Sequence, residues 1–503
     1  MNILGKKSDA IPLTGCLAVT VLVYLPALAK HLVADDWVFI MPHSFFETLG
    51  YFFTSIIPPE WYSLWLRPVP MLFFWLDSVF WPGTEWGPHL INIIFHLCNI
   101  ILIWSIMRFI LSRSSGSQDT FYAGCSCCVA CLLYGMHPLG VGSIAWVAAR
   151  FDVMSVTFGL AAMLMWMKWD AGISGVRALA GSLVFSILCI LSKEQGIIFI
   201  AICFIISLLR SISSFEERKK HLKGLVLLGS MVMVYAIYRL IVFNGIGGYL
   251  TARHGFSIRP PMSYLAALLF PYLNPIPGWT FSWTFFGAVF IVGLLILYLW
   301  KTTKKTVGKI DRIYILTAAI LFIFGLATTA PHPELTFEAI LDHAESRFAL
   351  IAITGFSLLT GIAVAKLTQK PHRFKMVLVL LGVWTVISAW RTDVQIQAWK
   401  QSGNIAHSII QETLEQTPDP PPNSSILFFD IPRNNDQFAY IFGIGLKEAL
   451  LLNYDNRDDI TIIRYPKRKD LRAARPGIDS VFRYNVRTGK LEKLHAPESQ
   501  KKL

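Results

Sequence analysis

Hydrophobic residues come in long runs separated by short polar segments, from the start of the chain to about residue 391. A helix that crosses the roughly 30 Å hydrocarbon core of a bilayer needs about 20 mostly apolar residues. Counting such runs predicts about eleven spanning helices, near 11–30, 87–111, 121–137, 152–169, 176–192, 195–210, 224–242, 283–300, 313–330, 347–365 and 376–391. We therefore expect an α-helical polytopic membrane protein.

Lysine and arginine fall mainly in alternate short connections between these runs. The basic segments are Lys6 with Lys7, Arg108 with Arg113, Lys168 with Arg177, 210–223, 301–312 and 366–375. Because basic loops stay in the cytoplasm, these connections are expected on the cytoplasmic side of a bacterial inner membrane. An odd number of spans then puts the other loops and the C-terminus on the periplasmic, outer face.

The overall composition fits this class. Hydrophobic residues make up 54% of the 503, charged residues only 15%, and the mean hydropathy is +0.52, which is too apolar for a soluble enzyme of this size. A net charge of +13 could suit nucleic acid, but topology accounts for where the charges lie. We expect membrane lipids and no nucleic acid among the partners.

The first outer loop, 31–86, is rich in Trp, Tyr and Phe, which is typical of helices that lie in the headgroup region. Residues 64–82 could be taken as another span. Three prolines, Arg67 and Asp77 fall within them, however, and a further crossing would move every later basic cluster outside. We also expect the first run, although it ends in a cleavage-like "ALA", to be a retained helix, because it is long for a signal sequence.

The chain becomes mixed in composition after the last span. We divide it into a transmembrane module at 1–391, a linker at 392–422 and a small α/β domain at 423–503. In the last part "NSSILFFDI" and "DITIIRY" predict strands, "QFAYIFGIGLKEALLL" a helix, and "SVFRYNVRTGKLEKL" a hairpin that turns at Thr488 and Gly489. No catalytic motif is recognised in this domain.

Ionisable residues gather on the outer side, although such groups are costly at membrane depth. Carboxylates beside cations and imidazoles suit a substrate whose hydroxyl is deprotonated and whose phosphate is held. A lone Asp after a span usually marks the exit from the membrane, and a lone His in a helix is more often a core hydrogen-bonding group. Co-location favours a site, and the adjacent carboxylates Asp35 and Asp36 repel, which can raise the pKa of one.

Several motifs together resemble a known family. "ADDW" is similar to the Asp-Asp or Asp-Glu motif in the first outer loop of the C-fold (GT-C) membrane glycosyltransferases. The stretches "LRPVPMLFFWLD", "GPHLINIIFHL", "HPLGVGSIAWVAARFDVMS", "LSKEQG", "ESRFALIAITGF" and "RTDVQIQAW" follow in order. This set, over roughly 30–410, resembles the branch of the TPR-containing protein O-mannosyltransferases and their bacterial relatives, but the chain has no such repeats after its last helix.

The resemblance implies an inverting hexosyl transfer, with mannose as one candidate sugar, from a polyprenyl-phosphate-linked donor to a hydroxyl of a protein, lipid or surface glycan. It makes Asp35 and Asp36 the catalytic acidic motif, one of them the general base. The residues expected to line the donor pocket are Arg67, His137, Arg150, Lys193, Glu194, Glu345 and Arg347.

No cofactor is expected. A divalent cation could assist but is not required, and the cysteine-rich "CSCCVAC" lies within an apolar run, which favours packing over a metal site. The alternative function is a transporter or flippase for a lipid-linked sugar, which would use the same cations without transfer chemistry.

Overall fold

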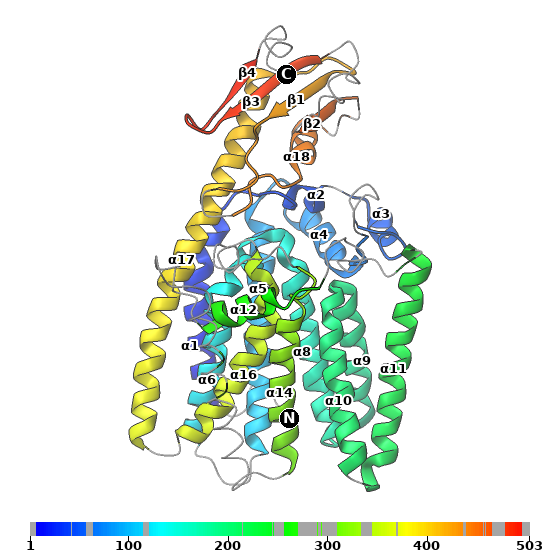
Figure 1. Ribbon diagram of the computed structural model, residues 1–503, viewed down its shortest axis with the longest axis vertical. Coiled ribbons are helices and arrows are strands. Elements are labelled where there is room, and N and C mark those ends of the chain that lie inside the picture. The colour runs from blue at the N-terminus through cyan, green and yellow to red at the C-terminus, as the bar shows by residue number, and fades with distance from the viewer. Residues whose placement is uncertain are drawn as a thin grey trace.

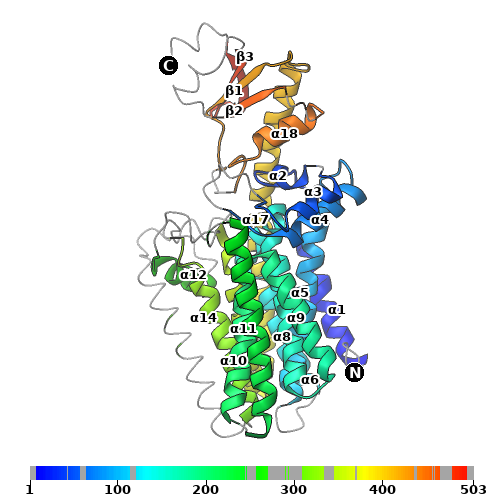
Figure 2. The same cartoon turned by 90° about the vertical axis from the view of Figure 1, so that its right-hand side faces the viewer.

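The computed structural model has a bundle of long helices with a small sheet domain at one end (Figure 1, Figure 2). It describes residues 7–41, 43–56, 64–113, 120–213, 215–243, 245, 256–269, 289, 293, 309–332, 345–368, 371–435, 439–455, 457, 459–464 and 478–494. The long helices are α1 (Lys7–Tyr24), α5 (Trp86–Ser112), α6 (Thr120–Gly135), α8 (Arg150–Asp170), α9 (Gly175–Ser192), α10 (Ile197–Ser213), α11 (Phe215–Phe243), α14 (Lys309–Ala327), α16 (Leu350–Leu367) and α17 (Pro371–Gln416).

The predicted class of helical membrane protein is confirmed. Within the described residues, eight helices are long and apolar enough to cross a membrane. A ninth crossing counts if α6 and the helices after it, bent by 51° at His137, form one broken span. The expected span at 313–330 appears as the shorter apolar helix Arg312–Ala327, and almost all of 283–300 lies outside the described residues.

The helix ends gather at two levels, which we call the sheet end and the basic end (Figure 1). At the basic end, the Asp170 carboxylate accepts two hydrogen bonds from Arg210, both of 2.9 Å, and one of 2.8 Å from the Tyr314 hydroxyl. Lys220 donates to the Asp170 carbonyl over 2.9 Å. Through its carboxylate and its backbone carbonyl, Asp170 thus joins the ends of α8 and α10 to the starts of α11 and α14.

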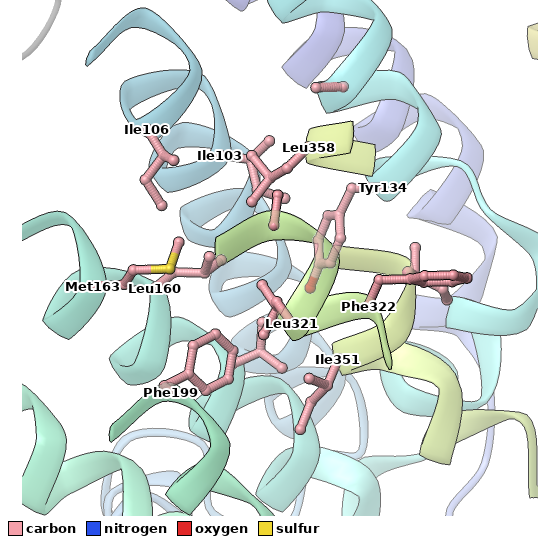
Figure 3. Close-up of a cluster of buried hydrophobic side chains, with 14 of the residues drawn as sticks. Ile103, Ile106, Tyr134, Leu160, Met163, Phe199, Leu321, Phe322, Ile351 and Leu358 are labelled. Carbon is pink, nitrogen blue, oxygen red and sulfur yellow. The ribbon is translucent and has the colours of Figure 1, made fainter. Parts of the chain in front are cut away.

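The centre of the bundle is closely packed by side chains from α5, α6, α8, α10, α14 and α16 (Figure 3). Ile103, Leu160, Phe199 and Leu321 are all completely buried. The crossing of α14 and α16 is especially close, because a Cβ added at Gly355 would fall 2.3 Å from the Phe322 backbone nitrogen. Such close approach through small residues is a common way for helices to associate in a membrane.

Short helices cover the sheet end of the bundle. They are η1 (Leu25–Ala29), α2 (Asp36–Ile40), α3 (Phe45–Gly50), α4 (Pro68–Phe80), η2 (Pro138–Gly140), α7 (Val141–Ala145), η3 (Val147–Ala149), η4 (Glu194–Gly196), α12 (Arg259–Leu269) and η6 (Glu345–Ala349). Helix α4 is 13 residues long and lies beside α2 and α3 at this end (Figure 1, Figure 2). The tight turn expected at "SKEQG" is present as η4, between α9 and α10.

The sheet domain stands on α17, which runs unbroken for 46 residues through most of the segment that we expected to be a linker. Strands β1 (Ser425–Phe429), β2 (Thr461–Arg464), β3 (Ile478–Asn485) and β4 (Lys490–Leu494) form a sheet in the order β2-β1-β3-β4. β1 pairs in parallel with β2 and β3, and β4 closes the expected hairpin antiparallel to β3.

The helix expected over 437–452 is wrong in its first half, since α18 covers only Leu446–Asn453. Before it, Tyr440 forms a bridge with Asn434, and Gly445 has a φ of +91° that ends any helix there. The physical reason is tertiary: residues 439–445 pair with other segments, as described below.

Candidate functional site

The acidic pair lies where the loop after η1 enters α2, and Asp36 is held firmly there. The Asp36 side chain is completely buried. Its Oδ2 accepts a hydrogen bond from the Val33 backbone N–H over 3.0 Å, and its Oδ1 accepts one from the Ala148 N–H over 2.7 Å. Because both oxygens are used by the backbone, Asp36 ties its own loop to the start of α8.

Asp35 differs from its neighbour. Its side chain is only partly buried, and the hydrogen bond that acts on its carboxylate comes from its own backbone N–H. Burial raises the pKa of Asp35 to about 7, with Asp36 and Glu345 acting in the same direction and Arg347 opposing them. The pKa of Asp36 is raised to about 6 by burial, against Lys30 and its two backbone hydrogen bonds.

Glu345 and Arg347, from η6, lie in the electrostatic surroundings of Asp35. Arg347 Nη2 lies 3.3 Å from Glu345 Oε2, and the two side chains remain 13% and 20% exposed. The Arg347 guanidinium covers the ring of Trp146 at 4.6 Å. A cation near the surface and close to a free carboxylate can hold an anionic group while the carboxylate accepts a proton.

Tyr440, from the sheet domain, completes this group. Its hydroxyl donates to Glu345 Oε1, and its ring packs against Trp146 with centroids 5.2 Å apart. The Tyr264 hydroxyl donates to the Glu345 carbonyl over 2.5 Å. Sequence reasoning missed Tyr440, because it sits in a segment that looked like part of an amphipathic helix.

Arg67 and Glu194 form a second pair at the sheet end, although 127 residues separate them in the chain. Arg67 Nε donates to Glu194 Oε2 over 3.0 Å and Nη2 to Oε1 over 2.6 Å. The guanidinium lies over the ring of Trp65 at 4.3 Å. Arg67 is 2% exposed and Glu194 21%, so the carboxylate is the more accessible member of the pair.

Arg150 is completely buried and surrounded by partners. It donates to Asn92 Oδ1 over 2.9 Å, to Asp77 Oδ2 over 2.5 Å and to the Pro88 carbonyl over 2.8 Å. Its guanidinium also covers Phe74 at 4.3 Å. These contacts hold α8 against α4 and α5. Arg150 follows closely after Ala148, whose N–H donates to Asp36.

Lys193 and His137 are also buried among protein groups. Lys193 Nζ donates to Asp152 Oδ1 over 2.5 Å. The His137 ring bridges the Leu268 carbonyl, at 3.0 Å, and the Leu139 N–H, at 3.2 Å. Of the nine residues predicted from the sequence, the structure therefore leaves Asp35, Glu194, Glu345 and Arg347 with the most accessible polar atoms.

The sheet domain lies directly on the loop of the acidic pair (Figure 2). Ala34 N–H donates to the Ile441 carbonyl over 2.9 Å, and Ala34 has a φ of +46°, which is strained for a residue with a side chain. A Cβ added at Gly445 would fall 2.0 Å from the Ala34 carbonyl oxygen. The close contact between Gly445 and Ala34 helps to hold the backbone that precedes Asp35.

We expect Gly445→Ala to loosen this contact. The substitution places a side chain at φ +91° and against Ala34, which should lower the free energy of unfolding of the sheet domain by roughly 1–3 kcal/mol. Hydrogen exchange followed by mass spectrometry should show faster exchange around Ala34. Gly443→Ala is the control, because a Cβ there meets nothing within 4 Å; equal exchange in both variants would contradict the prediction.

Two groups of described residues bring three metal-ligating side chains together, and neither includes Asp35 or Asp36. One is His31, Glu85 and His407 at the sheet end, and the other is Asp170, Glu217 and His221 at the basic end. In the second group both Asp170 oxygens already accept hydrogen bonds from Arg210.

Comparison with known proteins indicates the same resemblance as the ordered motifs. No family model matches the chain. Over 357 residues it is 20% identical to the protein O-mannosyl-transferase F38B6.6 of Caenorhabditis elegans, a match covering 66% of this chain and 47% of that protein. The chain resembles the protein O-mannosyl-transferases.

Further relatives carry the same name. The chain is 24% identical over 213 residues to Tmtc2 of Drosophila melanogaster, covering 41% of this chain and 22% of the relative. It is 28% identical over 163 residues to Tmtc3 of the same species, covering 28% and 17%. The matches thus span less than half the length of these relatives. The resemblance predicted from the motifs is confirmed.

Among solved structures, ArnT from Cupriavidus metallidurans, crystallised in the apo state and bound to undecaprenyl phosphate, is similar at a TM-score of 0.49. Sequence identity is 12%. The likeness to the bound form covers 94% of this chain and 92% of that one.

Proposed function

We propose that this chain is a membrane glycosyltransferase that moves a hexose from a polyprenyl-phosphate carrier to a hydroxyl acceptor at the sheet end of the bundle. The observation that carries the proposal is that the two carboxylates of the acidic pair have different surroundings. Asp36 is fixed by two backbone amides, whereas Asp35 has a partly exposed carboxylate with a pKa near 7 and no hydrogen-bond donor among the described side chains.

In the proposed step Asp35 is the general base. The acceptor hydroxyl loses its proton to an Asp35 oxygen while its own oxygen bonds to the anomeric carbon of the sugar. The bond from that carbon to the carrier phosphate breaks, and the electron pair leaves with the polyprenyl phosphate, so the anomeric configuration inverts. Because the leaving group is already a stable anion, no acid is needed to protonate it.

Arg347 is the residue that we assign to the leaving phosphate. It is partly exposed, lies in the surroundings of Asp35, and is held by Glu345 and the ring of Trp146. An arginine can hold phosphate through two parallel hydrogen bonds, which stabilise charge as it develops. Arg67 with Glu194 would extend this surface, whereas Arg150, Lys193 and His137 would support it through the fold.

Sugar, acceptor and orientation also belong to the proposal. The relatives' names favour mannose and a protein hydroxyl, such as that of serine or threonine, as the first substrates to test. The basic connections at the end opposite the sheet favour a cytoplasmic basic end, which would put the site on the outer, periplasmic face of a bacterial inner membrane.

The proposal is tested by transfer of radiolabelled mannose from polyprenyl-phosphate mannose to bacterial envelope proteins. Purified protein in nanodiscs should make labelled product that mass spectrometry assigns to Ser or Thr. Movement of the labelled lipid across vesicles without any product would instead support a flippase.

The pH dependence of kcat/KM gives a prediction of its own. Asp35 must be ionised to act as base, and its pKa lies near 7. The rate should therefore rise about tenfold per pH unit below pH 6 and level off above pH 8. Glu47→Gln, an exposed carboxylate in α3, is the matched control that should leave the profile unchanged. A profile that is flat from pH 5 to 8 would rule out a base of this kind.

A further inference from the structure

Three metal-ligating side chains from distant parts of the chain meet at the sheet end, outside the site described above. His31 precedes the acidic pair, Glu85 lies just before α5, and His407 lies in the C-terminal part of α17. His31 Nδ1 is 2.6 Å from Glu85 Oε2, and the rings of His31 and His407 stack with centroids 4.1 Å apart at 12°. One ligand atom from each residue lies within 4.8 Å of the other two.

The backbone is built to bring these residues together. A Cβ added at Gly403 would fall 2.8 Å from the His31 carbonyl oxygen and 3.1 Å from its Cβ. The absence of a side chain at Gly403 therefore lets α17 approach residue 31 closely. His407 is one helical turn further along, on the same face of α17, and so reaches the His31 ring.

The donor set indicates the kind of ion. Two imidazole nitrogens and one carboxylate oxygen suit zinc and similar transition metals, whereas calcium and magnesium prefer oxygen ligands alone. We propose that His31, Glu85 and His407 form a binding site for a divalent transition-metal ion such as Zn²⁺. All three side chains are partly exposed, which leaves a route for the ion and a position for water.

Bound zinc requires ligand distances of about 2.0–2.2 Å. The three atoms therefore draw together when the ion binds, and the His31–Glu85 hydrogen bond gives way to two metal bonds. The corresponding group at the basic end lacks this freedom, because Arg210 holds both oxygens of Asp170.

The ion would join three parts of the sheet end. It would fix α17, on which the sheet domain stands, to the start of α5 and to the segment that leads into Asp35. Lys30 connects the two regions, since its Nζ donates to the His31 carbonyl over 3.1 Å and it interacts electrostatically with both Asp36 and Glu85. This site is independent of the proposed transfer reaction and does not need it to be correct.

The test is a Zn²⁺ titration of the full chain, purified without a polyhistidine tag and treated with a chelator. Calorimetry should give one equivalent of Zn²⁺ per chain. At a hundredfold excess over Kd, Zn²⁺ should raise the midpoint of thermal unfolding by roughly 2–3 °C. Co²⁺ in place of Zn²⁺ should show visible absorption typical of nitrogen ligands.

His407→Ala and Glu85→Gln should each weaken binding by more than about tenfold, while unfolding without Zn²⁺ reports whether the variants fold. His43→Ala is the control, because His43 also lies at the sheet end but packs on Tyr51. Absence of Zn²⁺ binding by the wild type would overturn the proposal. So would unchanged affinity in a variant that carries both His31→Ala and His407→Ala.

Discussion

Replacing Asp35 by asparagine is expected to lower the rate of glycosyl transfer by about 10²–10⁴-fold, the usual contribution of a general base. The amide has nearly the same size and cannot accept the proton. The loss should appear in kcat as well as in kcat/KM, because donor binding does not need this carboxylate. Measurement of initial rates with radiolabelled donor, on protein that elutes normally in gel filtration, checks the prediction.

The same variant should be more stable than the wild type at pH 8. The pKa of Asp35 in the fold is about 7, above its ordinary 3.8, so the folded protein binds this proton more tightly than the unfolded chain does. The charged carboxylate therefore costs stability above pH 7, and this cost disappears as the pH falls towards 4. Asp35→Asn should raise the midpoint of unfolding at pH 8 and change it little at pH 4.

Asp36→Asn provides the contrast. One Asp36 oxygen would become an NH₂ group facing a backbone N–H, which leaves a buried donor without an acceptor at a cost of about 1–3 kcal/mol. This variant should lose stability along with activity. If Asp35→Asn retained full activity while Asp36→Asn lost activity without loss of stability, the roles assigned to the two residues would be reversed.

Arg150→Met is expected to destabilise the protein by about 3–5 kcal/mol, the largest stability effect that we predict. Arg150 and Asp77 are 0% and 2% exposed, so removal of the cation leaves a buried carboxylate without its counter-charge. Asn92 and the Pro88 carbonyl also lose their donors. Thermal unfolding in detergent and the yield of monodisperse protein are the measurements.

The double variant Asp77→Leu with Arg150→Met tests the cause. Replacing a whole buried pair by apolar residues often costs little, so the second substitution should recover part of the lost stability. Arg177→Met, on the basic end of α9, is the control and should be nearly neutral. Equal destabilisation in the single and double variants would show that lost packing, and not the unpaired charge, explains the effect.

The sequence predicted the helices of this fold well because a membrane imposes one strong requirement, a long apolar run, that can be counted. It predicted the end of α17 less well. Hydrophobicity falls where the helix leaves the apolar region, but the helix itself continues, and Ile396, Trp399, Ala406 and Ile410 keep a helical spacing of buried positions beyond that point. That spacing is the sequence signal that could have predicted the continuation of the helix.

For the candidate site, the sequence suggests residues but not their partners. The acidic pair stands out locally, but one of the two backbone N–H groups that donate to Asp36 belongs to Ala148, 112 residues away. Tyr440 gave no signal, since its place beside Glu345 depends on how the sheet domain sits on the bundle. Partners that meet only through tertiary packing have no mark in the chain around each residue.

Helix α17 sets both the distance of the sheet domain along the helix axis and its rotation about that axis. At about 1.5 Å per residue, its 46 residues are roughly 69 Å long, more than twice the hydrocarbon thickness. Because α17 is one continuous helix, each residue added to or removed from it would turn the sheet domain by about 100° around the helix axis. Tyr440 reaches Glu345, and Gly445 reaches Ala34, at only one value of this rotation. The number of residues in α17, more than their identity, therefore aligns the sheet domain with the bundle.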